Sequence, residues 1–475
     1  MRYKSNEFQE INKRRKFGIH LTSEEIFHKY IYPEIEHLLK GYIWVDLYAG
    51  EGNLILPILH YIHPKERQEF FSSHLFLFDV QEEMVEKSVN NAQSYGIPEN
   101  VAKHNILIRD NLDSFPKFLK EKELPIFHIT NPPYLYLGYI KKHHETQHYF
   151  KYFKGDNNGY QDLYQIAMIN DLRNGIENLI YIIPSNFLYG ASISNKFRLD
   201  FFKNYKILKM VIFETKTFEF TGTHICIGFF KAKKIPKVEN LRFPGIKIKK
   251  RNQIIRKEYE LKPNYKFRAG YEFAAFLKRY RAKNPLKVEY YLTDKMVLGN
   301  LGPNKTELID ANQYKKNTYK KLILGINEEL KQKLESNILY IRTVDTGSYN
   351  GRVGLGIIKD DFNVYGIYVS GKPYRTHPIQ IFFEPQVSLE DQFLLKSYFN
   401  FILEYFRKTL DSEFLTTYKY SNADYTRKYL GLNQTRKLIE TFPIKNLNKF
   451  ERQSLKGLIE SNKFDEVKQL VDQVK

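Results

Sequence analysis

The stretch Tyr42-Ile43-Trp44-Val45-Asp46-Leu47-Tyr48-Ala49-Gly50-Glu51-Gly52-Asn53 carries the clearest indication of the fold. The apolar run before Asp46 predicts a buried strand, and Gly50 and Gly52 predict a tight turn into a helix from Leu54. Glycines at such a turn let the backbone approach a ligand closely, and the start of the helix offers amide donors. The same turn is equally common as a structural element, so the surrounding pattern has to distinguish the two.

Further apolar runs predict strands at residues 75–78, 105–109, 125–130, 179–183 and 224–230. Helical patterns separate the first four predicted strands, which favours a parallel, doubly wound α/β sheet. The strands at the start of this series are followed by Asp46, Asp79, Asp110 and Asn131. Because ligands bind beyond the carboxyl ends of the strands in such sheets, we expect these side chains along one binding rim. Taken singly, Asp79 and Asp110 are as consistent with helix caps.

The chain has 475 residues, 42% of them hydrophobic, which is enough for two domains or more. No stretch has the eighteen or so uncharged apolar residues of a membrane span, and the polar N-terminus does not resemble a signal peptide. A single cysteine, Cys226, excludes an internal disulfide and indicates a reducing compartment. We therefore expect a cytoplasmic protein without membrane contact.

The net charge of +20 is unevenly distributed along the sequence. Residues 1–230 contain 27 Lys+Arg and 27 Asp+Glu, whereas residues 231–475 contain 47 and 27. Such an excess attracts a polyanion, because each neutralised phosphate releases a condensed counterion; the alternative is a lysine-rich solvated surface. The charged, proline-containing stretch 231–237 predicts a boundary between domains 1–235 and 236–475, the second of mixed α+β type.

The sequence Asn131-Pro132-Pro133-Tyr134 is the sharpest chemical signal. A nucleobase amine is a poor nucleophile because its lone pair is delocalised into the ring. An Asn oxygen and the rigid carbonyl of the following proline can accept the amine hydrogens and draw the nitrogen toward tetrahedral geometry. The tyrosine offers a flat face for an extruded base. The alternative is a proline-stiffened turn behind a strand.

Other candidates point to ordinary structural roles. His143, His144 and His148 have no cysteine or carboxylate cluster beside them, which favours a solvated loop, and we expect no metal. Cys226 lies inside an apolar run, which favours a core residue over a nucleophile. That position also disfavours cytosine-C5 methylation, which requires a cysteine to add covalently to the ring.

Taken in order, these residues resemble the gamma-class (Taq-like) N6-adenine DNA methyltransferases of restriction–modification systems, over about residues 13–230. The resemblance implies the cofactor S-adenosyl-L-methionine, with Asn131 to Tyr134 as the catalytic tetrapeptide. It also implies a role for each cofactor-binding position. Thr22 would lie near the methionine part, Asp46, Gly50 and Gly52 would form the glycine loop, Asp79 would bind the ribose, and Asp110 would bind the adenine amine.

The resemblance implies a second aromatic residue that sandwiches the flipped base together with Tyr134. Spacing favours Phe218, with Phe220 close behind, and a core position is the alternative for either. The C-terminal half resembles target-recognition domains only in its general sequence character. The candidates in this half for contact with guanine bases or phosphates are Arg342, Arg352 and Arg375. Each is equally consistent with an ordinary surface arginine.

The sequence thus predicts a doubly wound, Rossmann-like methyltransferase sheet followed by a mixed α+β target-recognition domain. We expect a monomer that flips an adenine out of double-stranded DNA and methylates its N6 amine, with a separate cognate restriction endonuclease as a candidate partner. Two alternatives stay open. One is methylation of an amine in ribosomal or other RNA, and the other is a DNA-binding specificity subunit whose catalytic half is vestigial.

Overall fold

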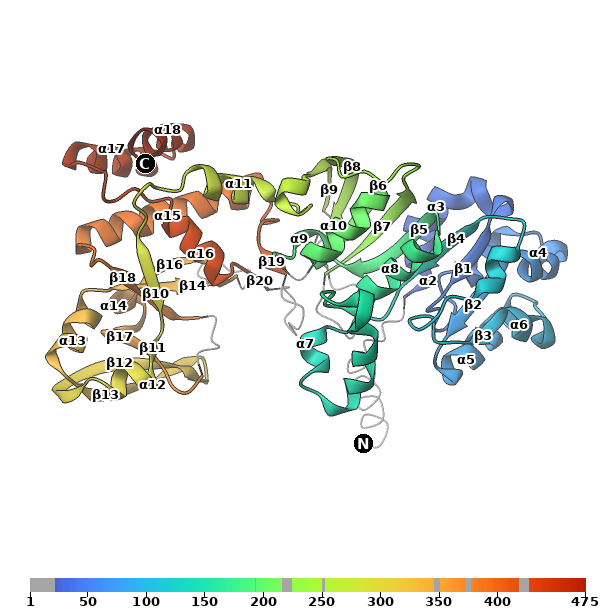
Figure 1. The fold of residues 1–475 in the computed structure, drawn as a ribbon, viewed down its shortest axis with the longest axis horizontal. Coiled ribbons are helices and arrows are strands. Elements are labelled where there is room, and N and C mark those ends of the chain that lie inside the picture. The colour runs from blue at the N-terminus through green and yellow to red at the C-terminus, as the bar shows by residue number, and fades with distance from the viewer. Residues whose placement is uncertain are drawn as a thin grey trace. The chain divides into compact units, whose positions relative to one another are not determined.

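The computed structural model describes residues 22–192, 194–215, 224–249, 253–345, 351–372, 377–417 and 427–475. The chain divides into two compact units, shown in Figure 1. The first comprises Met1–Ala269 with Lys419–Thr426, and the second comprises Gly270–Tyr418 with Arg427–Lys475. No helix among the described residues is both long and apolar enough to cross a membrane.

The first unit is built on a sheet that has nine strands within the described residues, in the order β3-β2-β1-β4-β5-β7-β6-β8-β9. Strands β1 to β5 pair with one another in parallel, and β7 is antiparallel to both β5 and β6. This confirms the doubly wound sheet and the six strands expected from the sequence. The strand bounds are β1 Ile43–Asp46, β2 Leu75–Asp79, β3 Ile106–Ile108, β4 Ile126–Thr130, β5 Asn178–Pro184, β6 Tyr205–Phe213, β7 Ile225–Ala232, β8 Leu241–Ile248 and β9 Ile254–Leu261.

Short helical segments connect these strands, and Figure 1 shows α8 and α10 in front of the sheet. The helix bounds are α2 Glu24–Ile26, a π-helix Phe27–Ile31, α3 Tyr32–Ile35, α4 Arg67–His74, α5 Glu82–Ser94, α6 Glu99–Asn105, α7 Leu137–Ile140, α8 Leu163–Asn174, α9 Asn186–Tyr189 and α10 Asn195–Asn204. Among the 3-10 helices are Leu56–Tyr61 and His144–Phe153. The strand order reverses between β1 and β4, which is the topological switch point where such sheets bind ligands.

The sheet continues past the boundary expected at residue 235. β8 pairs in parallel with β6, and β9 pairs with β8, so both strands belong to the first unit. The units divide after Ala269, and the stretch 231–237 lies between two strands of one sheet. Pro244 and Gly245 lie inside β8, and such residues usually argue against a strand interior.

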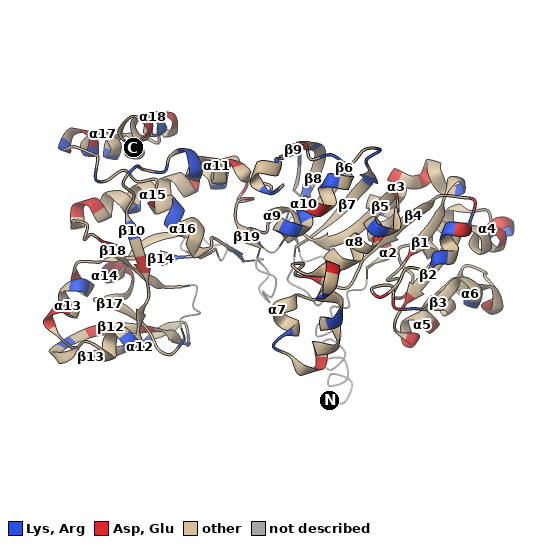
Figure 2. Cartoon of the chain, viewed as in Figure 1, with Lys and Arg blue, Asp and Glu red and all other residues tan. Residues whose placement is uncertain are grey.

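The positive charge is therefore shared between the units. The first unit contains 42 Lys+Arg and 31 Asp+Glu, a net charge of +11, and the second contains 32 and 23, a net charge of +9. β8 and β9 contribute Arg242, Arg256 and Lys257, and Figure 2 shows basic residues in this part of the sheet. Both units thus have the charge that favours a polyanion.

The second unit is a mixed α+β structure, as expected. Its described residues form sheets in the orders β10-β18-β14-β16, β11-β17-β12-β13 and β15-β20-β19. The strands are β10 Lys287–Tyr290, β11 Leu292–Thr293, β12 Leu301–Lys315, β13 Thr318–Ile326, β14 Leu339–Arg342, β15 Val344–Asp345, β16 Gly354–Ile357, β17 Gly366–Val369, β18 Ile379–Glu384, β19 Thr416–Thr417 and β20 Lys428–Tyr429. The helices are α11 Tyr271–Arg279, α12 Asp294–Leu298, α13 Glu328–Glu335, α14 Ile358–Phe362, α15 Leu389–Thr409, α16 Leu432–Ile439, α17 Lys449–Glu460 and α18 Phe464–Val474.

A buried arginine ties the end of the first unit to its helices. Arg198 on α10 is 0% exposed, and burial lowers its pKa to about 9, which leaves it protonated at neutral pH. Its guanidinium donates to the carbonyls of Lys266, Phe187 and Gly190 and to the side chain of Asn195, over distances of 2.7 to 2.9 Å. The bond to Lys266 holds the segment after β9 within this unit.

Replacing Arg198 by methionine should destabilise the first unit, because it leaves buried carbonyl groups without donors. We expect Arg198→Met to lower the free energy of unfolding by about 3–5 kcal/mol, measured by urea denaturation. Arg173→Met on α8 is the matched control, since Arg173 is exposed and should change stability by less than about 1 kcal/mol. Equal losses in the two variants would contradict this role for Arg198.

Candidate active site

A cavity of about 390 Å³ opens beyond the carboxyl ends of β1 to β4. It brings together most of the side chains that the sequence predicted for a binding rim. The predicted residues in its lining are Thr22, Asp46, Gly50, Asp79, Asp110, Asn131, Pro132 and Pro133. Gly52 and Tyr134, the other described residues expected there, lie outside this lining.

Asp46 lies at the base of the cavity, at the end of β1. It is 1% exposed, and its Oδ1 accepts hydrogen bonds from Thr130 Oγ1 at 2.6 Å and from the Tyr48 amide at 3.0 Å. Burial raises the pKa of Asp46 to about 6, against the opposing effects of nearby His128 and of these hydrogen bonds. The group is therefore mostly ionised at neutral pH and becomes protonated a little below it.

The glycine turn is fastened to the end of β2. The Gly50 amide donates to Asp79 Oδ2 at 2.9 Å, and the Gln81 amide donates to Asp79 Oδ1 at the same distance. Gly50 and Gly52 have φ angles of 54° and 85°, which favour glycine. A Cβ on Gly52 would lie 2.6 Å from the side chain of Leu56, so Gly52 allows close packing while Gly50 faces the cavity.

Asp110 lies just beyond β3 and is held by its own turn and by a neighbouring segment. Its Oδ1 accepts from the amides of Leu112 and Asp113 at 3.2 and 3.3 Å. Its Oδ2 accepts from the Tyr152 hydroxyl and lies 3.6 Å from Lys151 Nζ. The 3-10 helix His144–Phe153 therefore closes one side of the cavity.

Asn131 follows β4, and its side chain is held at both ends of the amide. Its Nδ2 donates to Thr22 Oγ1 at 3.0 Å, and its Oδ1 accepts from the Tyr134 hydroxyl. The Thr22 carbonyl in turn accepts from Asn53 Nδ2 at 2.9 Å. These contacts orient the amide with its nitrogen toward the N-terminal segment.

Tyr134 is the predicted site residue whose position differs most from the expectation. It is 3% exposed, and its hydroxyl oxygen also lies 2.6 Å from the Ile182 carbonyl, which shares the single hydroxyl hydrogen with Asn131 Oδ1. Burial raises its pKa well above the ordinary value, so the hydroxyl stays a donor. In this structure the ring packs in the core, and the hydroxyl anchors Asn131.

The structure adds residues that sequence reasoning missed. Asn111 is 3% exposed and donates from Nδ2 to the Leu47 carbonyl at 2.8 Å. Its Oδ1, in the cavity lining, has no hydrogen-bond partner among the described residues. Asn53, Arg109 and Tyr149 also line the cavity. The available signal was their position: Arg109 ends the predicted strand 105–109, Asn111 lies two residues beyond it, and Asn53 follows the predicted glycine turn.

Several predicted residues lie elsewhere. Cys226 is 0% exposed inside β7, and burial raises the pKa of its thiol, as expected for a core residue. Arg342 ends β14, and Arg352 Nη1 donates to Glu404 Oε2 at 2.9 Å. The remaining predicted residues, Phe218, Phe220 and Arg375, lie outside the described residues.

Comparison with known proteins relates the first unit to one family. Residues 43–218 match the Eco57I restriction-modification methylase family, and no curated protein matches the chain. The fold is similar to that of MmeI, a Type IIL restriction-modification enzyme solved in complex with DNA. That match has a TM-score of 0.52 and 12% identity, and it covers 98% of this chain and 76% of MmeI.

Two further solved structures match more weakly. The DrdV–DNA complex gives a TM-score of 0.36 at 11% identity over 54% of this chain. The type IIG restriction endonuclease BpuSI gives a TM-score of 0.39 at 12% identity over 94% of this chain. The chain spans 32% of DrdV and 61% of BpuSI.

The raised pKa of Asp46 predicts a pH dependence of stability. Its folded pKa of about 6 lies above the unfolded value of 3.8. The stabilisation from protonated Asp46 is therefore complete below about pH 4 and lost as the pH rises through about 6. Wild type should gain about 2–3 kcal/mol relative to Asp46→Asn when the pH falls from about 7 to about 4. Urea unfolding of the two proteins at both pH values measures this change. An equal difference in free energy of unfolding at pH values of about 7 and about 4 would contradict the prediction.

Proposed function

We propose that this chain methylates the N6 amine of adenine in double-stranded DNA with S-adenosyl-L-methionine as cofactor, because residues 43–218 match the Eco57I restriction-modification methylase family. It would act as the modification part of a restriction–modification system. The observation that carries the proposal is the oriented amide of Asn131, which lies beside Pro132 in the lining of the cavity.

The cavity fits the cofactor in volume and in donor set. About 390 Å³ lies within the range of small-molecule sites. The carboxylates of Asp79 and Asp110 suit ribose hydroxyls and an adenine amine, and Asn111 lines the same cavity. The residues proposed to hold the cofactor are Thr22, Asp46, Gly50, Asp79, Asp110 and Asn111, with Gly52 supporting the turn. S-adenosyl-L-methionine supplies an activated methyl group.

The proposed catalytic chemistry belongs to Asn131 and the proline after it. Asn131 Oδ1 and the Pro132 carbonyl would accept the two hydrogens of the target amine, which localises the lone pair on nitrogen. Thr22 and Tyr134 fix the amide, so the acceptor is oriented before the substrate arrives. Pro132 and Pro133 stiffen the backbone that carries these acceptors. Cys226 is buried, which supports amine methylation over covalent attack on a cytosine ring.

An adenine inside a duplex has to leave the stack to reach this cavity. Tyr134 stays our proposed stacking residue, with Phe218 as the opposing aromatic. Since the Tyr134 ring is buried, this role requires local movement of the loop when the base enters. Without that movement, Tyr134 acts only by anchoring Asn131.

The second unit is proposed to recognise the target sequence. Its net charge of +9 favours contact with phosphates through counterion release, and MmeI, which has a similar fold, was solved in complex with DNA. Arg342 stays a candidate for base or phosphate contact. Arg352 would have to leave Glu404 to make such a contact, so its proposed role is the weaker of the two.

Replacing Asn131 by alanine should abolish methyl transfer, because the amine loses its principal acceptor. We expect at least about a hundredfold loss of kcat with cofactor and DNA affinity changed less than about threefold. Methyl transfer from labelled cofactor to duplex DNA measures the rate, and calorimetry measures cofactor affinity. Asn186→Ala is a control, since that asparagine lies on α9 and not in the cavity lining. Near wild-type transfer by Asn131→Ala would reject the assignment.

The identity of the product tests the substrate. We expect mass spectrometry of nucleosides from methylated duplex DNA to show N6-methyladenine. N4-methylcytosine would contradict the choice of base, and preferential transfer to ribosomal RNA would establish the RNA alternative.

A further inference from the structure

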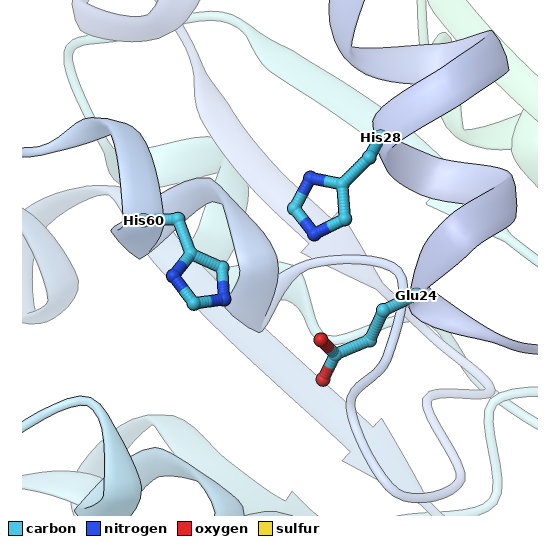
Figure 3. Close-up of side chains that lie close together, drawn as sticks. All are labelled: Glu24, His28 and His60. Carbon is cyan, nitrogen blue, oxygen red and sulfur yellow. The ribbon is translucent and has the colours of Figure 1, made fainter.

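Glu24, His28 and His60 form a cluster that does not belong to the cavity lining. One potential metal ligand atom from each residue lies within 4.8 Å of those of the others. Figure 3 shows the two imidazole rings and the carboxylate turned toward a common centre. Glu24 and His60 are exposed and His28 is half-buried, so ions can reach the cluster from solvent.

The cluster joins two segments that are distant in sequence. Glu24 lies in α2 and His28 in the π-helix that continues it, so they are about one helical turn apart. His60 comes from the 3-10 helix Leu56–Tyr61, which follows the glycine turn. The rings of His28 and His60 have centroids 5.5 Å apart and planes tilted by 50°. They are not stacked face to face, and such a tilt lets ring nitrogens converge on one point.

The neighbours of the cluster fix the orientation of the His28 ring. His28 Nδ1 lies 2.8 Å from the Tyr61 hydroxyl, and Tyr61 stacks on Tyr32 with centroids 3.4 Å apart. A histidine that ligates a metal usually uses its other ring nitrogen in such a hydrogen bond, which fixes the ring orientation. That arrangement leaves Nε2 of His28 to face Glu24 and His60. The Tyr95 hydroxyl donates to Glu24 Oε1 at 3.4 Å and supports the carboxylate.

We propose that Glu24, His28 and His60 bind one divalent transition-metal ion, of which Zn²⁺ suits the donors best. Two imidazoles and one carboxylate are a common ligand set for zinc, with water in the fourth tetrahedral position. Zinc ligand distances of about 2.0–2.2 Å put ligand atoms about 3.3 Å apart. The side chains therefore have to close by at most about 1.5 Å from the 4.8 Å limit. Exposed side chains make such a movement by small rotations.

The ion would act as a clamp beside the cavity. Thr22, two residues before Glu24, contacts Asn131 and Asn53. The segment with His60 continues directly from the glycine turn. A metal bridge between the two segments would hold Thr22 against that turn. The bridge does not depend on the proposed DNA substrate, because it needs only the residues of the cluster.

Metal binding by the full-length protein tests the proposal. Bound metal is first removed with a chelator. Calorimetric titration with ZnCl₂ should then show tight binding of one Zn²⁺ ion per chain. Titration with MgCl₂ should show no binding, because Mg²⁺ prefers oxygen ligands. Each of the replacements Glu24→Gln, His28→Ala and His60→Ala should lower the affinity for Zn²⁺ at least about a hundredfold. Tyr61→Phe should lower this affinity about tenfold. His104→Ala is the matched control, since His104 is an exposed histidine on α6 outside the cluster.

Hydrogen exchange locates the bound ion. Zn²⁺ should slow amide exchange in residues 24–31 and 56–61 of wild type but not of His60→Ala, because the clamp suppresses local opening. The proposal is wrong if the cluster variants bind Zn²⁺ as wild type does, or if exchange in these segments is unchanged by the metal. Circular dichroism of the metal-free variants checks that they fold; Glu24 and His60 are exposed, so their replacements should leave the fold intact.

Discussion

The hydrogen bond from Thr130 Oγ1 to Asp46 Oδ1 joins the two strand ends around which the site is arranged. It is 2.6 Å long and buried, and it links β4 to β1 where the strand order reverses. Asn131 follows Thr130 directly, and the glycine turn follows Asp46. Beneath them, His128 Nε2 accepts from the Leu47 amide, and its Nδ1 lies 2.7 Å from Asp171 Oδ2. A buried polar layer of this kind is costly unless its groups are paired, and paired it holds one geometry. The positions of the tetrapeptide and the glycine turn are thus coupled.

Thr22 couples a third part of the chain to this edge. Its carbonyl accepts from Asn53 and its hydroxyl from Asn131, so the residue bridges the glycine turn and the tetrapeptide. A segment that precedes the sheet in sequence therefore helps to orient the Asn131 amide, for which we propose a catalytic role. The same contact gives a physical reason for the N-terminal stretch in the family resemblance drawn from the sequence.

The sequence predicted the parts of the fold that are buried on both faces. The apolar runs 43–45 and 75–78 are fully buried, so their strands could be recognised. β8 and β9 mix charged and apolar residues, and Pro244 lies inside β8, so these strands and the boundary after Ala269 were missed. Rim residues at strand ends were predictable from topology. The burial of Tyr134, the orphan oxygen of Asn111 and the grouping of His60 with Glu24 depend on tertiary contacts that spacing does not encode.

The position of the unit boundary has a consequence for how such chains can be recombined. Arg198 finds one of its acceptors at Lys266, and the Ala269 amide donates to the Leu188 carbonyl. A hybrid gene joined near codon 235 would separate β8 and β9 from their sheet and remove the Lys266 acceptor of this guanidinium. A junction just after codon 269 would keep all strands of this sheet together. Exchange of the second unit between related genes, in nature or by design, should therefore favour the junction after codon 269.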